Sequence, residues 1–335
     1  MERGRWCRVG DMNENSMDNG QTDAARREDA ARTRTEERLA RERRYDAAGA
    51  VPPCGLPPAA DGGLAEVRRI SYGGTAGSFS EMAAKRMFPA AERVARRTFP
   101  EACDELEAGG CGAAVLPLRN TTGGAVDTVY RLLERGLSIA RFTDLYVEHC
   151  LAALPGARTE DVRTVVSHPQ AFAQCSKAIG QHGWRMEPAD NTAFAPGIVR
   201  AAGDPSKAAI CSREAAALNG LAVLAPNICD TPRSDITRFV AVTRGLIVTP
   251  DASRLSVLVH LAHRTGALAD VLDVLADRGL NLSAIAARPV PEKPWEYSFF
   301  LDIEAPAMAP SALAALRQFG EELPMVRVVG WYGEG

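Results

Sequence analysis

Short apolar runs alternate with amphipathic segments over residues 67–245. Runs such as Ala113–Leu116 and Val162–Val166 are rich in the aliphatic residues that are typical of buried strands. In Val126–Arg135 the apolar residues instead recur every three or four positions, which indicates a helix with one buried face. This alternation of strands and helices predicts an α/β domain with a largely parallel sheet.

A different order of elements follows a short linker at residues 246–253. The strand patterns are Leu255–Leu261, Leu280–Arg288, Tyr297–Ile303 and Val326–Trp331, and the helix patterns are Gly266–Arg278 and Ser311–Phe319. The order strand–helix–strand–strand–helix–strand over about 80 residues is that of a ferredoxin-like unit. We therefore predict a second domain of this fold at residues 254–333.

Residues 1–66 lack the apolar spacing of a folded domain. Leu39 is the only large aliphatic residue in Thr22–Ala48, which is otherwise rich in Ala, Arg and Glu, so this segment has no stripe to bury. Val51–Gly63 has the Pro- and Gly-rich composition of a linker. We expect a disordered extension or a solvated helix in this part of the chain.

Composition narrows the class of protein. Of the 335 residues, 46% are hydrophobic and the net charge is -3, which gives no general attraction to nucleic acid or to acidic lipid. No apolar run is long enough to span a membrane, and the N-terminus has no secretory signal pattern. The eight cysteines form no CxxC pair and have no histidines at zinc-binding spacing, so we expect reduced thiols, no metal site and a cytoplasmic location.

The first candidate for chemistry is the start of the strand that begins at Ile236, after the polar turn Thr231–Asp235. Thr237 can donate a hydrogen bond to a departing oxygen, and Arg238 can form a forked contact with a carboxylate. On these residues alone, a capped strand start with a surface arginine is the simpler interpretation. The functional interpretation therefore depends on the other polar loops.

Three further polar loops lie at strand ends, at Gly73–Ser78, Pro117–Gly124 and Ser167–Cys175. Ligands of α/β folds bind beyond the carboxyl ends of the strands, so we expect these loops and the turn before Thr237 to converge on one cleft. By itself Ser167 is most simply a helix N-cap. His149 is interpreted as a core or cleft-wall residue, because no second metal ligand is near it in the sequence.

These motifs resemble those of a known family. Four of them occur in the order seen in prephenate dehydratases, at Gly77–Glu81, Pro117–Thr121, Ser167–Cys175 and Thr237–Phe239. Three segments of the tail are similar to the phenylalanine-sensing ACT domain attached to those enzymes, at Gly266–Leu268, Ala287–Pro289 and Pro294–Tyr297. The resemblance extends from about Val67 to Tyr332, and several spaced motifs in one order are far more specific than any single motif.

The resemblance implies a two-lobed, periplasmic-binding-protein-like catalytic domain that converts prephenate to phenylpyruvate in L-phenylalanine biosynthesis, with no cofactor. It gives Thr237 the catalytic role of assisting the leaving hydroxyl, and Arg238 that of binding a substrate carboxylate. The other positions that it assigns to the substrate are Ser78, Phe79, Ser80, Arg119, Asn120, Thr121, Ser167, Gln170, Gln174 and Phe239.

The resemblance also implies regulation and assembly. L-phenylalanine is expected as an effector of the C-terminal domain, in an enzyme that forms dimers or tetramers. The positions expected to bind it are Gly266, Ala267, Leu268, Asn281, Leu282 and Arg288. Ala286 and Ala287 stand where the family usually has Glu-Ser, so the sequence does not decide whether phenylalanine inhibits.

Arg119 departs from the family, which usually has a glutamate at this position. If its side chain faces the cleft, the local charge changes by two units, which would either tighten binding of the dianion or remove an acid–base partner and slow turnover. The second outcome corresponds to a catalytically weak ligand-binding homologue. A second alternative is arogenate dehydratase, which performs the same chemistry on the aminated substrate. Some family members carry a chorismate mutase domain of about 90 residues in long amphipathic helices. The first 68 residues here lack that pattern, so we expect no mutase activity.

Overall fold

The computed structural model describes residues 56–231, 234–290, 293 and 295–335, together with scattered positions between 25 and 45. These scattered positions are all helical, in agreement with a helix within Thr22–Ala48. The chain divides into a unit at Met1–Val51 and a unit at Pro52–Gly335. The predicted turn at Thr231–Asp235 and the ACT-like segment Pro294–Tyr297 each include residues outside the described part.

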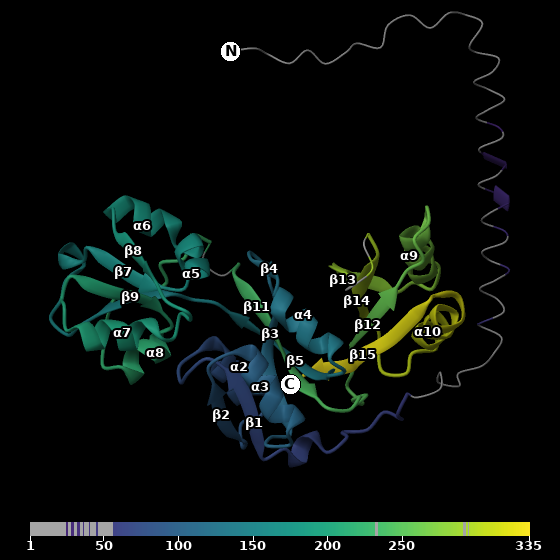
Figure 1. Ribbon diagram of the computed structural model, residues 1–335, viewed down its shortest axis with the longest axis horizontal. Coiled ribbons are helices and arrows are strands. Elements are labelled where there is room, and N and C mark those ends of the chain that lie inside the picture. Colours follow the sequence, from purple (N-terminus) through teal and green to yellow (C-terminus); the bar gives the residue numbers. More distant parts are fainter. Residues whose placement is uncertain are drawn as a thin grey trace, which may run out of the picture. The chain divides into compact units, whose positions relative to one another are not determined.

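The first lobe of the α/β domain is a sheet with helices on both faces (Figure 1). Its strands are β1 (Arg69–Gly73), β2 (Glu92–Arg96), β3 (Ala113–Asn120), β4 (Gly124–Ala125), β5 (Ser138–Tyr146) and β11 (Ile236–Thr243), and its helices are α2 (Phe79–Met87), α3 (Phe99–Glu107) and α4 (Asp127–Glu134). Phe239 and Ala241 pack with α2, whereas Val240 and Val242 pack with α3 and α4, as the alternation of side chains along a strand requires. Strand β11 therefore has two faces with different surroundings.

The second lobe is a separate sheet in the order β10-β6-β9-β7-β8. Its strands are β6 (Cys150–Ala153), β7 (Thr164–Ser167), β8 (Arg185–Pro188), β9 (Lys207–Cys211) and β10 (Ala222–Ala225), and its helices are α5 (Pro169–Gln174), α6 (Ser176–His182), α7 (Ala195–Ala202) and α8 (Arg213–Leu218). Leu151 and Ile210 pack with α5 and α6, whereas Ala152 and Ala209 pack with α7 and α8. Figure 1 shows these two pairs of helices on opposite sides of the sheet.

The strands of the α/β domain are mixed in direction, so the prediction of a largely parallel sheet was wrong. Strand β1 is parallel to β2 and β3, and β7 is parallel to β8 and β9. Strand β11, however, is antiparallel to both β3 and β5, and β6 is antiparallel to β9 and β10. The reason is that the chain leaves the first lobe after β5 and returns to it along β11, which places β11 between strands of the opposite direction.

The C-terminal domain has the predicted βαββαβ order. Its elements are β12 (Arg254–His260), α9 (Ala267–Asp277), β13 (Asn281–Pro289), β14 (Tyr297–Glu304), α10 (Pro310–Glu322) and β15 (Met325–Glu334). The sheet order is β13-β14-β12-β15, and the two helices pack with it in one core cluster that includes Val257, Leu275, Leu316 and Trp331. The predicted ferredoxin-like fold is confirmed.

Strand β15 joins the C-terminal domain to the first lobe, which the sequence pattern did not predict. It pairs in parallel with β5, so one sheet continues in the order β13-β14-β12-β15-β5-β11-β3-β1-β2. The close approach depends on Gly330, because a Cβ atom there would lie 2.4 Å from the carbonyl oxygen of Ile139. The junction is thus built from backbone hydrogen bonds and a glycine.

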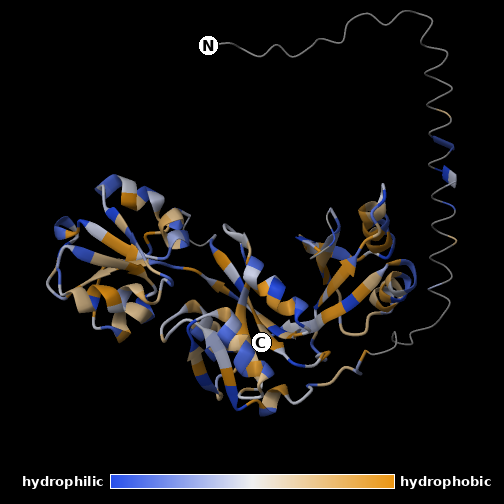
Figure 2. Ribbon diagram, viewed as in Figure 1, coloured by the Kyte–Doolittle hydropathy of each residue, from blue (hydrophilic) through white to orange (hydrophobic). Residues whose placement is uncertain are grey.

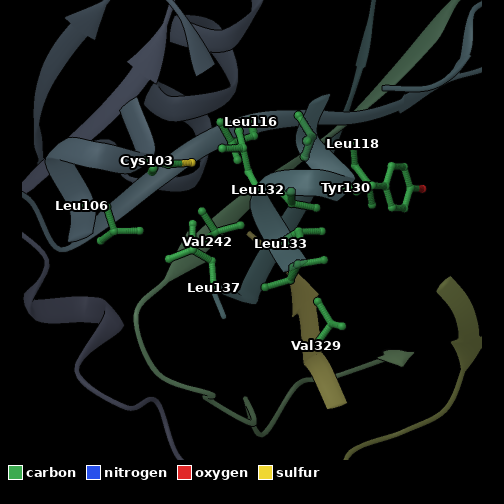
Figure 3. Packing of buried hydrophobic residues seen from close by; sticks show 14 of the residues in the cluster. Cys103, Leu106, Leu116, Leu118, Tyr130, Leu132, Leu133, Leu137, Val242 and Val329 are labelled. Carbon is green, nitrogen blue, oxygen red and sulfur yellow. The ribbon is translucent and has the colours of Figure 1, made fainter. Parts of the chain in front are cut away.

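The hydrophobic core is shared across this junction. Leu118, Tyr130 and Leu133 of the first lobe belong to the same buried cluster as Phe300 and Val329 of the C-terminal domain. Figure 3 shows Leu132 and Leu133 of this cluster with Val329 on β15. In Figure 2, the strands at the centre of the lobes are largely orange, and the helices around them carry both colours. Within the described residues, no helix has the length and apolarity needed to cross a membrane.

Candidate active site

A cavity of about 740 Å³ lies between the two lobes. The first lobe contributes the loop before α2, the start of α3 and the facing ends of β3 and β11, and the second lobe contributes α5 and residues 190–192. The lining includes many of the predicted site residues, namely Ser78, Phe79, Ser80, Asn120, Gln170, Gln174, Thr237 and Phe239. The polar loops that lie far apart in the sequence therefore converge on one cavity.

Thr237 and Asn120 form the centre of this polar lining. They are register partners in the β11–β3 ladder, and Asn120 Nδ2 donates a hydrogen bond of 2.8 Å to Thr237 Oγ1. Thr237 lines the cavity and is only 7% exposed. Because it lies on β11, a rigid strand holds its hydroxyl at the cavity. Because Thr237 Oγ1 accepts the amide proton, its own proton remains available for a ligand.

The Asn120 amide is fixed at both ends. Its Oδ1 accepts hydrogen bonds from the backbone N–H groups of Thr122 (2.8 Å) and Gly123 (2.7 Å) and from the Thr122 hydroxyl (2.7 Å). Its Nδ2 donates to Asp235 Oδ1 at 2.6 Å in addition to Thr237. A flipped amide would turn its N–H groups toward backbone donors, so the orientation is determined by the surrounding chain.

His149 and Gln174 form a second polar pair in the cavity wall. His149 Nε2 is 3.0 Å from Gln174 Oε1, and Gln174 Nε2 donates to Thr122 Oγ1 at 3.3 Å. Burial lowers the pKa of His149 below its ordinary value, so the ring is neutral and its Nε2 carries the proton that Gln174 accepts. The ring also meets Phe79 edge-on, with centroids 5.6 Å apart. His149 thus holds both Gln174 and Phe79.

The loop before α2 is fixed against the second lobe. Ser78 is the N-cap of α2 and accepts a hydrogen bond from Glu81 N at 3.2 Å, and Ser212 Oγ donates to the carbonyl of Gly77 at 2.6 Å. Gly77 has a φ of +81°, and a Cβ atom there would lie 2.6 Å from Ala215 Cα. The N-terminus of α2 is therefore held at the cavity, and the Glu81 carboxylate occupies it by accepting a hydrogen bond from Gly77 N at 2.6 Å.

Arg97 is a lining residue that sequence reasoning missed. Of the described residues that line the cavity, it is the only arginine or lysine. Its Nη2 lies 2.8 Å from Asp190 Oδ2 on the other lobe, and the two side chains are 71% and 73% exposed. A pair this exposed contributes little to stability, so a carboxylate ligand can replace Asp190 as the partner of Arg97. Its place directly after β2 was the available signal, because β2 is parallel to β1.

Arg238 does not line the cavity, which corrects the prediction that it binds a substrate carboxylate. It is the neighbour of Thr237 on a strand and therefore points to the opposite face. There its Nε and Nη2 donate to the two carboxylate oxygens of Asp144 at 2.8 and 2.7 Å, and its guanidinium lies 4.3 Å from the centre of the Phe142 ring. In this structure Arg238 is a structural residue between strands.

Arg119 also points away from the cavity. Its Nη2 lies 3.2 Å from Asp302 Oδ2 in β14, and its Nη1 donates to the carbonyl of Ser283 at 3.5 Å. Two further predicted residues hold the framework instead of lining the site. Ser167 Oγ donates to the carbonyl of Ile210 at 2.6 Å, and Thr121 Oγ1 donates to the carbonyl of Ser234 at 2.7 Å.

The positions predicted to bind phenylalanine lie in two places. Gly266 is the N-cap of α9 with a φ of +81°, and Ala267, Leu268 and Leu282 are partly buried against the core of the C-terminal domain. Asn281, at the start of β13, donates to Glu304 Oε2 at 2.9 Å. Arg288 is at the other end of β13 and forms an ion pair with Asp127 at the start of α4, so it does not join the others.

A cavity between two α/β lobes, together with a ferredoxin-like domain on the same sheet, defines the class of two-lobed ligand-binding proteins with an attached ferredoxin-like domain. Residues 70–245 match the family model described as prephenate dehydratase, and residues 255–321 match the model described as ACT domain. The chain belongs to the prephenate dehydratase family, as its motifs predicted.

Two curated relatives show the extent of the similarity. The chain is 34% identical over 281 residues to arogenate dehydratase/prephenate dehydratase 1, chloroplastic, of Arabidopsis thaliana, covering 79% of this chain and 71% of the relative. It is also 34% identical over 272 residues to the bifunctional chorismate mutase/prephenate dehydratase of Escherichia coli (strain K12), covering 79% and 70%.

Two solved structures share the arrangement of the domains. The prephenate dehydratase of Arthrobacter aurescens, in complex with L-Phe, aligns with a TM-score of 0.72 at 30% identity and covers 79% of this chain and 90% of its own. A structure described as GqqA, a novel type of quorum-quenching acylase, aligns with a TM-score of 0.72 at 28% identity and covers 80% and 98%.

Proposed function

We propose that this protein is a prephenate dehydratase, a carbon–oxygen lyase of L-phenylalanine biosynthesis that forms phenylpyruvate from prephenate. The observation that carries the proposal is the Asn120–Thr237 hydrogen bond in the wall of a cavity lined by the family's polar motifs. Membership of the prephenate dehydratase family and the names of the relatives in Arabidopsis and Escherichia coli support the same activity.

The reaction breaks two bonds of the substrate. As carbon dioxide leaves, the electron pair of the broken C–C bond enters the ring, and the ring hydroxyl departs with the electron pair of its C–O bond. Thr237 donates a hydrogen bond to this departing oxygen, and the stabilisation increases as negative charge develops there. Aromatisation of the ring supplies the driving force, so the chemistry needs no cofactor.

The two carboxylates of the substrate need positive charge in the cavity. We assign this role to Arg97, since Arg238 and Arg119 are directed elsewhere. Gln170 and Gln174 supply uncharged polar contacts from the second lobe. Arg119 was the reason to consider a catalytically weak homologue, and its side chain contacts Asp302 and Ser283 rather than the cavity.

Turnover by the purified protein tests the proposal directly. Prephenate is added and phenylpyruvate is followed by its absorbance, with Thr237→Ala and Thr237→Ser as a matched pair. We expect Thr237→Ala to lower kcat by about 100-fold with KM largely kept, and Thr237→Ser to retain most of the activity, because only the alanine lacks the donor. Unchanged turnover in Thr237→Ala would remove Thr237 from the mechanism.

Arogenate is the second candidate substrate, because the Arabidopsis relative is named for both activities. The two substrates differ by an amino group in place of a keto group on the side chain. The ratio of kcat/KM for prephenate and arogenate, measured on the same preparation, decides between them.

Regulation by L-phenylalanine is proposed for the C-terminal domain, supported by the ACT match and by the L-Phe complex of the Arthrobacter enzyme. Calorimetry of the full chain with L-phenylalanine should show binding, and Asn281→Ala, at a predicted effector position, should weaken it. Binding that is unchanged in Asn281→Ala would place the effector elsewhere.

Assembly into dimers or tetramers is also proposed. Exposed apolar side chains on the C-terminal domain, including Ile285 (45%) on the edge strand β13 and Trp295 (81%), support pairing through this domain. Light scattering of the purified protein measures its oligomeric state. A cytoplasmic location is proposed as well, and it is supported by the free thiol form of every cysteine in the described part of the chain.

A further inference from the structure

The carboxylate of Asp235 is buried directly behind the candidate active site. Asp235 is 2% exposed and lies in the turn that precedes β11. Its Oδ1 accepts a hydrogen bond from Asn120 Nδ2 at 2.6 Å, and Thr122 Oγ1, whose proton is donated to Asn120 Oδ1, lies 3.5 Å away. Its Oδ2 is buried and has no hydrogen-bond partner among the described residues. Burying a carboxylate costs free energy unless hydrogen bonds replace its lost hydration.

The backbone holds Asp235 in this position. Val147 N donates to the carbonyl of Asp235 at 2.8 Å, so the turn is tied to the segment that connects the two lobes. Asp235 does not line the cavity. Its effect on a substrate therefore passes through Asn120, the side chain that separates it from Thr237.

The Asn120 amide has two N–H bonds, and each donates to a different acceptor. One is donated to Asp235 and the other to Thr237 Oγ1. The bond to a carboxylate is the stronger of the two, because its acceptor is charged. Asp235 therefore adds a charged acceptor to the three donors that hold Oδ1, and the second N–H of the amide lies on a lone pair of Thr237.

We propose that Asp235 is a positioning residue for the dehydration step, which rests on the proposed function. It anchors the Asn120 amide so that the amide occupies a lone pair of the Thr237 hydroxyl and directs the Thr237 proton into the cavity. Without this anchor, the hydroxyl rotates and donates elsewhere for part of the time. Substrate binding is retained, because Asp235 does not itself line the cavity.

The experiment is a double-mutant cycle in the full chain, with prephenate as substrate. Asp235→Asn keeps the shape and removes the charge, and we expect kcat to fall about 10- to 100-fold while KM stays within about twofold. In a Thr237→Ala background the same change should lower kcat less than about twofold, because the group through which Asp235 acts is absent. A purely structural role would lower kcat equally in both backgrounds.

Asp230→Asn is the matched control. Asp230 lies between β10 and β11, as Asp235 does. It accepts hydrogen bonds from Ser176 Oγ (2.6 Å) and Lys177 N (3.0 Å), and its side chain does not contact Asn120. Its kcat should stay within about twofold of that of the unmodified protein. Asp235→Ser is the second variant in case the asparagine does not fold, since it keeps a smaller acceptor, and the same loss of kcat is expected.

The outcomes separate the inference from the function on which it rests. Wild-type activity with unchanged kcat in Asp235→Asn would overturn the positioning role alone. Equal losses in the wild-type and Thr237→Ala backgrounds would also overturn it. A wild-type protein that turns over neither prephenate nor arogenate would overturn the proposed function and this role together.

Discussion

The ion pair between Arg119 and Asp302 connects the strand that carries Asn120 to the C-terminal domain. The nitrogen and oxygen atoms are 3.2 Å apart, and the side chains are 24% and 9% exposed. Unit charges at such a separation attract by about 5 kcal/mol at an effective dielectric constant of about 20. Arg119→Ala leaves Asp302 with only Arg238 as a cationic neighbour in the described chain, at 3.7 Å. We expect the free energy of unfolding to fall by about 3 kcal/mol, as for a broken, largely buried pair.

Urea unfolding followed by circular dichroism measures this change. Arg119→Ala, Asp302→Asn and the double variant form a cycle, and we expect a coupling energy of about 2 kcal/mol. Arg254→Ala serves as the control, because it breaks the Arg254–Glu304 pair between β12 and β14, whose glutamate is 44% exposed, and its loss should be under about 1 kcal/mol.

The same variants test where Arg119 points. Its side chain contacts the C-terminal domain, so Arg119→Ala should leave KM for prephenate within about twofold of the unmodified value. A coupling energy below about 0.5 kcal/mol would refute the ion pair. A large rise in KM without loss of stability would instead place Arg119 at the substrate.

Three other results are expected. Arg97→Ala should raise KM for prephenate about tenfold with little change in kcat, whereas Asp190→Asn, which frees Arg97, should lower KM; steady-state kinetics decide both. Gly330→Ala should destabilise the protein by about 1–3 kcal/mol in urea unfolding, because its Cβ would meet the Ile139 carbonyl. The pKa of His149 is depressed in the folded protein, so the unfolded chain binds the proton more readily and the free energy of unfolding should fall as the pH drops below about 6.5. His149→Gln should flatten that fall in urea unfolding at a series of pH values. An unaltered pH profile would contradict the depressed pKa.

The arrangement of domains and the convergence of loops were predictable from local patterns. The polar loops at the ends or starts of strands were expected to converge on one cleft, and Asn120, Gln174 and Thr237 do line one cavity between the two sheets. The βαββαβ order of the tail follows from periodicity alone. Both inferences depend on contacts that are near in sequence or fixed by fold class.

Arg238 shows where motif reasoning failed although the physical rule was available. Consecutive side chains on a strand point to opposite faces, so Thr237 and Phe239 can share a cavity only if Arg238 lies outside it. The family resemblance gives Thr237, Arg238 and Phe239 a shared role, whereas the alternation of side chains along a strand separates Arg238 from the other two. The partner of Arg238, Asp144, is 94 residues away in the chain, which no local pattern reveals.

Other features could not be read from the sequence because they depend on long-range register. The pairing of β15 with β5 brings residues around Gly330 beside Ile139, and neither segment carries a mark of the other. Asp235 has the composition of an ordinary turn residue, and only the fold shows that its carboxylate meets Asn120. The β11–β3 ladder skips Leu118 on β3, a register shift that local propensity does not encode.

Arg238 connects the C-terminal domain to the strand that carries Thr237, although its side chain does not line the cavity. The guanidinium is held by Asp144 on β5 and lies 3.7 Å from Asp302 on β14, so it contacts a carboxylate from each domain. A shift of β14 relative to β5 must lengthen one of these contacts or move Arg238 itself. Since Thr237 is the preceding residue on the same strand, such a movement changes the position of the Thr237 hydroxyl relative to Asn120. An effector that moved β14 relative to β5 would therefore change turnover through Arg238 and Thr237.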